Sequence, residues 1–258
     1  MRRLGLRAVA LGYVAVLLAI PVGLVFYRTF EHGLAAVQDS VTTPAAMHAF
    51  WLTLEIAAIA VPLNTVFGVL AAVALVRGRW RGKALIEAII DLPFAVSPVV
   101  IGLALILVYG RGGWLDTGAQ VIFAVPGMVL ATIFVSLPFV VREVAPVLRE
   151  VGEEQEQAAA TLGANARQTF LRVTLPSIRW GIAYGVVLST ARAIGEFGAV
   201  SVVSGKIAGQ TETLTLLVDK RFSNFDLAGA YAASALLAVI ALATLLAMTL
   251  IKPRKEHT

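Results

Sequence analysis

The chain has 258 residues, of which 59% are hydrophobic and only 14% are charged, and its formal net charge is +5. A soluble domain averages about 25% charged residues, so this composition indicates a chain whose main solvent is lipid. The absence of cysteine excludes a disulfide, a thiolate metal site and a cysteine nucleophile. The basic residues stand in short clusters beside apolar runs, which is typical of a membrane protein rather than of a nucleic-acid-binding surface.

Six apolar segments are each long enough to cross a hydrocarbon core about 30 Å thick. They are predicted at about residues 6–26, 49–76, 84–109, 119–141, 178–203 and 227–251. The first segment could be a cleaved signal peptide, but no small-x-small cleavage site follows it, and a retained helix is favoured. We therefore expect an all-α membrane protein with a single transmembrane domain over residues 1–258.

Proline interrupts the third segment. Pro93 and Pro98 lie five residues apart, and the two missing backbone donors are expected to kink or break the helix there. Such breaks in membrane helices usually pack inside protein or line a cavity. The hydroxyl of Ser97 most often satisfies a freed carbonyl at such a position, although a broken helix could also present its amides to an anion.

A polar segment of residues 142–177, called the polar island below, separates the fourth and fifth spans. It holds five acidic residues, and five basic ones when Arg179 just beyond it is included. A connection this long between short-looped segments is usually functional, so we expect it to fold as helices that dock another protein. An amphipathic helix on the lipid surface is the alternative, but the acidic run Glu150–Glu156 would be poorly placed against anionic lipid.

The distribution of Lys and Arg predicts the orientation of the chain. With six spans, the amino terminus, the 77–83 loop, the polar island and the carboxyl-terminal tail lie on one side and carry 15 of the 21 basic residues. The opposite side carries five, and Arg192 lies within a span. Because positive charge marks the cytoplasmic side, both termini and the polar island are expected in the cytoplasm.

Two ionisable residues, Arg192 and Glu196, lie deep in the fifth span. Their i, i+4 spacing places both on one helix face. Charges at mid-bilayer are costly and usually face the bundle interior or a water-filled path. Either the pair lines a pathway, with Arg192 available to an anion, or it is an ion pair that only fixes helix packing. Together with Ser97, these are the candidate residues of a translocation path.

The motifs of nucleotide-binding and hydrolytic enzymes are absent from the sequence. It contains no G-x-x-x-x-G-K-[ST] phosphate loop, no H-E-x-x-H metal motif and no G-x-S-x-G nucleophile elbow. We therefore expect a transporter subunit rather than an enzyme, with no cofactor and no metal in this chain. Energy for uphill transport would have to come from an ion gradient or from a partner.

The polar island carries a motif that resembles a known family. The spacing E-A-A-x3-G-x9-I-x-L-P is typical of the inner-membrane permease subunits of binding-protein-dependent ABC importers. The Glu position holds Gln157, with Glu156 one residue earlier. Gly163 allows a turn between two short helices, and Asn165 is a possible helix cap. The matching residues are Ala158, Ala159, Gly163, Leu175 and Pro176, with Val173 in the Ile position.

The resemblance extends from the second span to the sixth. Three stretches, Asp91–Val100, Ala191–Gly205 and Thr211–Leu217, are similar to those of sulfate/thiosulfate permeases. Molybdate and tungstate permeases are close relatives and carry a similar ARA-[IL]-GEFG stretch. The resemblance therefore implies import of sulfate or thiosulfate, with molybdate or tungstate as the alternative.

The family implies an architecture and a set of partners. It implies a type I ABC importer permease (MetI-like) fold with six transmembrane helices and a cytoplasmic coupling helix, in the inner membrane of a prokaryote. Two permease subunits, here expected to be two related chains, would pair with two ATPase subunits that bind ATP and Mg. An extracytoplasmic sulfate-binding protein would deliver the substrate. The residues expected to couple this chain to the ATPase are Gln157, Ala158, Ala159, Leu162, Gly163, Leu175 and Pro176.

Two other classes of function remain open at this stage. An ion-coupled secondary transporter could use Glu196 as its proton site. The chain could also be a subunit of a non-transporting membrane assembly or of an enzyme, although the absence of a recognisable nucleophile, metal set or cofactor site argues against an enzyme.

Overall fold

The computed structural model describes residues 9, 11–31, 33–116 and 118–251. These residues fold as helices joined by turns, without a strand among them, so the predicted all-α class is confirmed. The helices are η1 (Ala15–Ala19, a π-helical turn), α2 (Ile20–Phe30), α3 (Gly33–Val41), α4 (Pro44–Arg77), α5 (Lys83–Ala95), α6 (Pro98–Tyr109), α7 (Val125–Val151), α8 (Glu154–Thr161), α9 (Ala166–Thr169), η2 (Phe170–Thr174, also π-helical), α10 (Leu175–Ser177), α11 (Arg179–Ile194), α12 (Gly198–Val203), α13 (Leu214–Ser223) and α14 (Leu227–Ile251).

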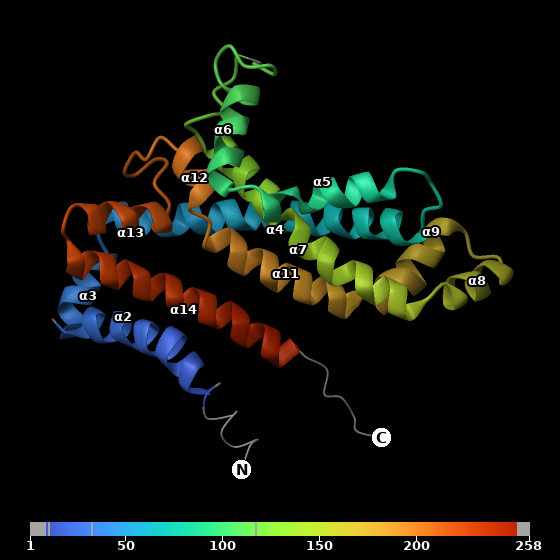
Figure 1. The fold of residues 1–258 in the computed structure, drawn as a ribbon, viewed down its shortest axis with the longest axis horizontal. Coiled ribbons are helices and arrows are strands. Elements are labelled where there is room, and N and C mark those ends of the chain that lie inside the picture. The colour runs from blue at the N-terminus through green and yellow to red at the C-terminus, as the bar shows by residue number, and fades with distance from the viewer. Residues whose placement is uncertain (1–8, 10, 32, 117, 252–258) are drawn as a thin grey trace.

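Three helices, α4, α7 and α11, pack against one another and form the centre of the molecule (Figure 1). Two glycines bring their backbones close to Val140 of α7, which is fully buried. A Cβ atom on Gly68 of α4 would lie 2.7 Å from the Cβ of Val140, and one on Gly185 of α11 would lie 2.9 Å from its Cα. Small residues at such crossings let membrane helices gain dispersion contacts where lipid offers no hydrophobic driving force.

A buried amide fixes α4 against α7. Asn64 of α4 is fully buried, and its Nδ2 donates to the Oγ of Ser136 at 2.8 Å and to the carbonyl oxygen of Ile133 at 3.1 Å. Hydrogen bonds between helices in a membrane contribute about 1 kcal/mol each. This bond selects one register of α4 on α7, because a slipped helix would leave the amide without these acceptors.

The third and fifth predicted segments are each broken into two helices. The chain bends by 113° between α5 and α6. Pro98 occupies the first turn of α6, so the break predicted at this proline is confirmed. α11 ends at Ile194, and α12 begins only at Gly198. The two breaks adjoin, because a Cβ on Gly198 would lie 2.8 Å from the Cβ of Pro98. α6 and α12 then pack together, α12 also packs against α7, and α6 projects from the long helices (Figure 1).

The helix bounds differ from the predicted spans at several ends. The fourth segment is helical from Val125 rather than from 119, since Pro126 sits in the first turn, and α7 then runs ten residues into the polar island. The second begins five residues earlier than expected, at Pro44, where the hydroxyl of Thr43 caps the helix. Residues 6–8 and 10 of the first segment and the basic tail beyond residue 251 lie outside the described residues.

Four described helical stretches are long and apolar enough to cross a membrane: Leu11–Phe30, Pro44–Arg77, Val125–Val151 and Leu227–Thr244. The bent pair of α5 and α6 makes a fifth if it is one span. α11 has only 16 residues, so the fifth predicted segment reaches span length only across its break. The count of six spans and the cytoplasmic location of both termini stay predictions.

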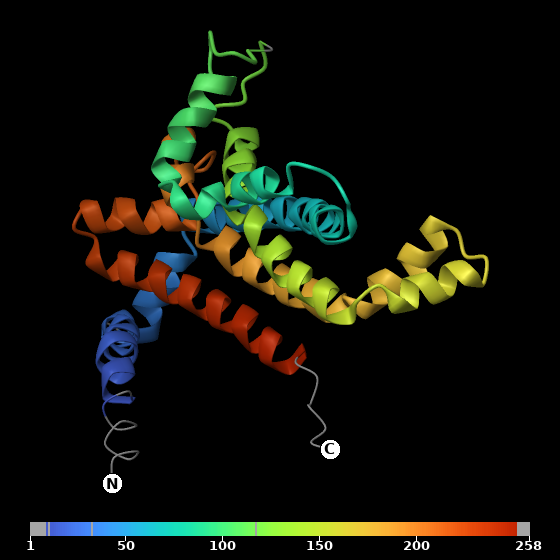
Figure 2. The same cartoon turned by 45° about the vertical axis from the view of Figure 1, so that its right-hand side comes forward.

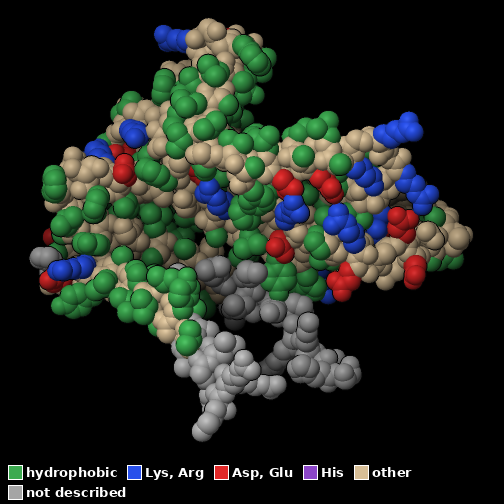
Figure 3. All heavy atoms as spheres, viewed as in Figure 1, with side chains coloured by type: hydrophobic (Ala, Val, Ile, Leu, Met, Phe, Trp, Pro, Cys, Tyr) green, Lys and Arg blue, Asp and Glu red, His purple; other side chains and the backbone are tan. Residues whose placement is uncertain are grey.

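Charged side chains gather over the end of the molecule that carries α5, α8 and α9 (Figure 3). Two acidic residues on α5, Glu87 and Asp91, face two arginines on α7. The Nε and Nη2 of Arg142 donate to the two carboxylate oxygens of Asp91. The Nη2 of Arg149 lies 3.3 Å from the Oε1 of Glu87. The i, i+4 acids of one helix thus match arginines two turns apart on the other, and the two pairs align α5 along α7.

The close approach at Val140 generates a stability prediction. Gly185→Ala places a methyl group 2.9 Å from the Cα of Val140, and overpacking of this kind costs about 1–3 kcal/mol. We expect a lower thermal unfolding temperature for the detergent-solubilised protein. Gly23→Ala, where a Cβ meets nothing within 4 Å, is the matched control and should leave stability unchanged or slightly raised. Equal unfolding temperatures for both variants would contradict the close approach.

Candidate functional site

The polar island folds as a helical arm that projects from one end of the bundle (Figures 1 and 2). α7 ends at Val151, and Gly152 turns the chain with a φ of 71°. α8 runs outward and ends at a turn in which Gly163 has a φ of 86°. α9, η2 and α10 bring the chain back to α11. The expected pair of short helices around a glycine turn is therefore present.

The return of the arm is fixed by a capping box. The Oδ1 of Asn165 accepts from the backbone N–H of Gln168, and the Oε1 of Gln168 accepts from the N–H of Asn165, both at 2.9 Å. These reciprocal bonds satisfy two amides that a helix start leaves free. Asn165 therefore takes the predicted capping role, and the turn at Gly163 has a defined exit.

Much of the arm surface faces outward. None of the residues of α8 or α9 is buried, and Leu162 at the tip is 88% exposed. A groove of about 590 Å³ opens between α8 and the returning segment. A large apolar side chain beside a small-residue groove is an arrangement that a partner protein can cover. The groove is lined by Gln155, Ala158, Ala159, Leu162, Arg172, Val173, Pro176 and Ser177.

The structure thus brings together four of the seven residues predicted to couple this chain to a partner: Ala158, Ala159, Leu162 and Pro176. Gly163 forms the turn beside them, whereas Leu175 is half-buried and outside the groove lining. Gln157 is exposed on α8, also outside the lining. The neighbouring Glu156 is directed toward the bundle, where its carboxylate contacts Arg77 of α4. Gln157, at the motif's carboxylate position, is therefore exposed, whereas the carboxylate of the neighbouring Glu156 contacts the bundle.

The intramembrane pair sits at the break between α11 and α12. Arg192 is in the last turn of α11, and its Nη1 lies 2.5 Å from the Oε2 of Glu196, which is only 3% exposed. The Oε1 of Glu196 accepts from the N–H of Ala199 at 2.8 Å, and its carbonyl oxygen accepts from Thr215. The carboxylate therefore joins both halves of the broken segment and compensates the charge of Arg192.

Ser97 lies at the other break, immediately before α6. It is exposed, and its hydroxyl makes no capping bond to the helix. Because Pro98 adjoins Gly198, the structure brings the Ser97 break and the Glu196 break close together. The three candidate pathway residues thus flank one junction of four helix ends. Whether they contact a transported ion stays a prediction.

Sequence reasoning missed two sets of polar residues. Arg77 was counted only as part of a basic cluster, because no pattern connects it with Glu156, 79 positions away. Glu212 is 1% exposed, and its Oε1 lies 3.0 Å from the Nζ of Lys220. From the sequence, a carboxylate in a polar connecting segment is expected to be solvated. Only the packing of α13 shows that Glu212 is buried. Among the described residues, no group of three or more His, Asp or Glu could hold a metal ion.

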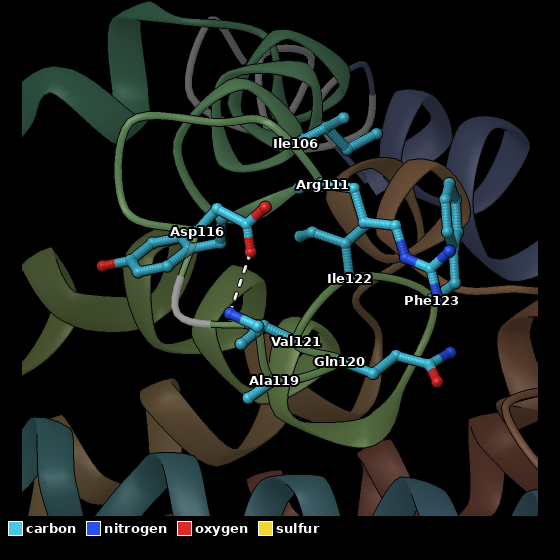
Figure 4. Close-up of a pocket in the computed structure, with 11 residues that line it drawn as sticks. Ile106, Arg111, Asp116, Ala119, Gln120, Val121, Ile122 and Phe123 are labelled. Carbon is cyan, nitrogen blue, oxygen red and sulfur yellow. Dashed lines mark hydrogen bonds between the residues drawn. The ribbon is translucent and has the colours of Figure 1, made fainter.

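A larger hollow, of about 790 Å³, lies in the loop between α6 and α7 (Figure 4). Its lining residues with polar side chains are Tyr109, Arg111, Asp116 and Gln120. The carboxylate of Asp116 accepts from the N–H of Gly112 at 2.7 Å and from that of Gly118 at 3.0 Å, and Figure 4 marks the second bond. These two backbone donors hold the pKa of Asp116 below its ordinary value, because they stabilise the ionised form.

Comparison with known proteins gives a family. Residues 64–257 match the family described as "Binding-protein-dependent transport system inner membrane component". The "Sulfate transport system permease protein CysW" of Synechococcus elongatus is 50% identical over 256 residues, covering 97% of this chain and 90% of the relative. The "Sulfate transport system permease protein CysT" of the same organism is 38% identical and covers 90% of this chain and 86% of the relative.

A solved structure shares the fold. One chain of a bacterial ABC transporter involved in the import of the acidic polysaccharide alginate superposes with a TM-score of 0.80. The match covers 99% of this chain and 97% of that chain at 16% sequence identity. The likeness shows the architecture, which is that of an ABC importer permease.

The hydrogen bonds of Asp116 generate a pH prediction. Its pKa is lowered in the folded loop, so their stabilising effect is present above the ordinary pKa of an aspartate, about 3.9, and is lost as the pH falls through the lowered value. Hydrogen-exchange protection of the Gly112 and Gly118 amides, corrected for the intrinsic rate, should therefore drop in acid. Asp116→Asn should show no such drop, and protection that persists in acid in both proteins would contradict the assignment.

The turn at Gly163 generates a docking prediction. Gly163→Pro demands a φ near −65° and removes the N–H that donates to Ala160, so the turn should open and co-purification of the ATPase that the motif predicts as partner should fail. Gly163→Asn is the matched control, because asparagine tolerates positive φ and a side chain there meets nothing within 4 Å. Both proteins should still insert in the membrane. Normal ATPase recovery with Gly163→Pro would remove the turn from the docking site.

Proposed function

The chain belongs to the family of binding-protein-dependent transport system inner membrane components, and from that membership we propose that it is the permease subunit of an ATP-driven importer of sulfate or thiosulfate. The observation that carries the proposal is the 50% identity to a sulfate transport permease over 97% of the chain. The exposed groove of the arm supports it, because a permease without its own phosphate loop must receive energy through a contact surface.

The proposed assembly has four kinds of subunit. Two ATPase subunits bind ATP and Mg, and this chain contributes no cofactor or catalytic group. The second permease is a related chain, since one organism has both a CysW and a CysT relative of this protein. An extracytoplasmic sulfate-binding protein delivers the anion. The complex lies in the inner membrane of a prokaryote, and this chain crosses that membrane six times. Both of its termini and the 142–177 arm lie in the cytoplasm.

The proposed mechanism is alternating access driven through the arm. Closure of the ATPases on ATP moves the groove residues of α8, and this motion reorients the long helices around the pathway. Coupling residues are Gln157, Ala158, Ala159, Leu162, Gly163, Leu175 and Pro176. Exposed Leu162 inserts into the partner, while the small side chains of Ala158 and Ala159 permit close approach of the two backbones.

The junction of the two helix breaks is the proposed pathway element. The Arg192–Glu196 ion pair has no net charge, and burying it in a low-dielectric bundle costs less free energy than burying either charge alone. The free hydroxyl of Ser97 and the first amides of α6 offer donors to a passing anion. This arrangement supports weak contacts with sulfate rather than a tight site, so that the binding protein sets the specificity.

An ion-coupled mechanism is disfavoured by the same geometry. A proton site needs a carboxylate that gains and loses a proton during transport. Glu196 is only 3% exposed, is ion-paired with Arg192 and accepts from the amide of Ala199, so its carboxylate is engaged in holding the α11–α12 break and does not stand open to a water-filled path.

Uptake by the reconstituted complex tests the proposal. Proteoliposomes with this chain, a CysT-type permease, the ATPase and the binding protein should accumulate labelled sulfate only with MgATP. An uncoupler should have no effect while ATP is clamped, because no ion gradient is used. Uptake that collapses with the uncoupler would indicate a secondary transporter. Competition by molybdate at concentrations equal to sulfate would reassign the substrate.

A further inference from the structure

The docking helix α8 has no apolar anchor of its own on the bundle. None of its residues is buried, and its main packing contacts are with α9 and η2 of the same arm. A helix that delivers motion to membrane helices needs a stiff connection to them. The connection must therefore come from the chain ends of the arm or from specific polar contacts.

A single guanidinium supplies such a contact. Arg77 is the last residue of α4, and its Nε lies 3.0 Å from the Oε2 of Glu156 on α8, while its Nη2 lies 3.3 Å from the Oε1. The same Nη2 donates to the carbonyl oxygen of Gly152 at 2.5 Å. The planar fork of arginine matches the two carboxylate oxygens and holds them in one orientation.

Glu156 extends the contact to the returning segment. Its Oε1 also accepts from the hydroxyl of Thr174 at 2.9 Å, and Thr174 is buried at the end of the π-helical turn η2. π-Helical turns inside helices occur frequently at functional sites. The carboxylate thus connects α4 with the outgoing helix α8 and the returning segment η2, and Arg77 connects them with the α7–α8 turn.

The ion pair between Arg77 and Glu156 is less exposed to solvent than the ion pair between Arg149 of α7 and Glu87 of α5. The side chains of Arg77 and Glu156 are 15% and 22% exposed, whereas those of Arg149 and Glu87 are 57% and 46% exposed. Solvent-exposed pairs contribute little because water and salt screen them. A bidentate pair is harder to break when it is mostly shielded, when its carboxylate accepts from one more donor, Thr174, and when its guanidinium donates to one more acceptor, the carbonyl of Gly152. Arg77 also lies at a helix C-terminus, where a cation is favoured.

We propose that Arg77, Glu156 and Thr174 form a joint that fixes α8 to the cytoplasmic end of α4, so that displacement of the arm by the ATPase moves α4 with it. The inference rests on the proposed function and adds positioning residues that do not touch the ATPase or the substrate. It also assigns Glu156 and Gln157 different roles. Gln157 faces the partner, whereas Glu156 holds the arm to its own bundle.

Transport stoichiometry in the reconstituted complex provides the first test. With Glu156→Gln or Arg77→Gln, the ATPase should still co-purify, but sulfate uptake per ATP hydrolysed should fall about tenfold, a typical coupling effect. The double variant should be no worse than either single one, because both remove the same joint. Arg77→Lys keeps the charge but loses the fork and should restore little. Exposed neighbours give the matched controls, Glu154→Gln on α8 and Arg79→Gln beyond α4.

A distance measurement tests the joint without transport. Because the chain contains no cysteine, spin labels can be placed cleanly with Val66→Cys on α4 and Ala160→Cys on α8, both exposed. The α4–α8 distance distribution should be narrow and the same with and without ATP. Glu156→Gln should broaden it. If the charge variants do not assemble, Thr174→Val, which removes one donor and leaves the ion pair, should broaden it to a smaller extent.

The outcomes separate this inference from the proposed function. Absence of ATP-dependent sulfate uptake by the unaltered complex refutes the proposed function, and the distance measurement still decides the joint. Normal uptake per ATP in Glu156→Gln, with the unaltered complex active, overturns the joint. An unbroadened distance distribution in the Glu156 and Thr174 variants overturns it too. A purely structural role would lower assembly in proportion to uptake and leave the ratio unchanged, which also overturns it.

Discussion

The close crossing of α4, α7 and α11 at Val140 is the constraint on which the remaining structure depends. Two glycine positions allow backbones to approach this residue to distances that no larger side chain permits. Packing of this kind resists continuous deformation, because interdigitated side chains leave no room for small slips. Sliding of the three helices past one another is therefore costly. The arm and the broken segments are attached to the ends of this closely packed group.

Electrostatics places the charges around this body. Removing an ion from water costs several kcal/mol, and only a well-placed partner offsets this cost. Glu196 meets Arg192, Glu212 meets Lys220, and Glu156 meets Arg77. Each pair joins segments that the backbone alone leaves loosely connected: the broken fifth segment, the turn before α13 and the arm. Charge pairing thus holds these segments in place, as glycine packing holds the three central helices.

The sequence predicted the features that depend on local rules. Apolar length indicated the helices, Pro98 indicated the break, and Gly163 with Asn165 indicated the turn and the cap of the arm. It failed where a long-range contact decides the outcome. The start of α7 shifted to Val125, since the preceding residues form the loop that lines the hollow between α6 and α7. The connection of Glu156 to Arg77 had no local signal, because these two residues, 79 positions apart, meet only through the packing of α7 along α4, which places the ends of the two helices side by side.

The polarity of the joint at Arg77 is consistent with the surface that the arm must offer. An apolar anchor for α8 would need a buried stripe along the helix and would consume the face that carries Ala158 and Ala159. One carboxylate on the inner side anchors the helix at a single point and leaves the remaining faces exposed. A bidentate ion pair also fixes the orientation of α8 relative to α4, whereas an apolar contact is not directional and would let the helix rotate about its axis. The arm can therefore present Leu162 and its groove to a partner while its rotation relative to α4 stays restricted.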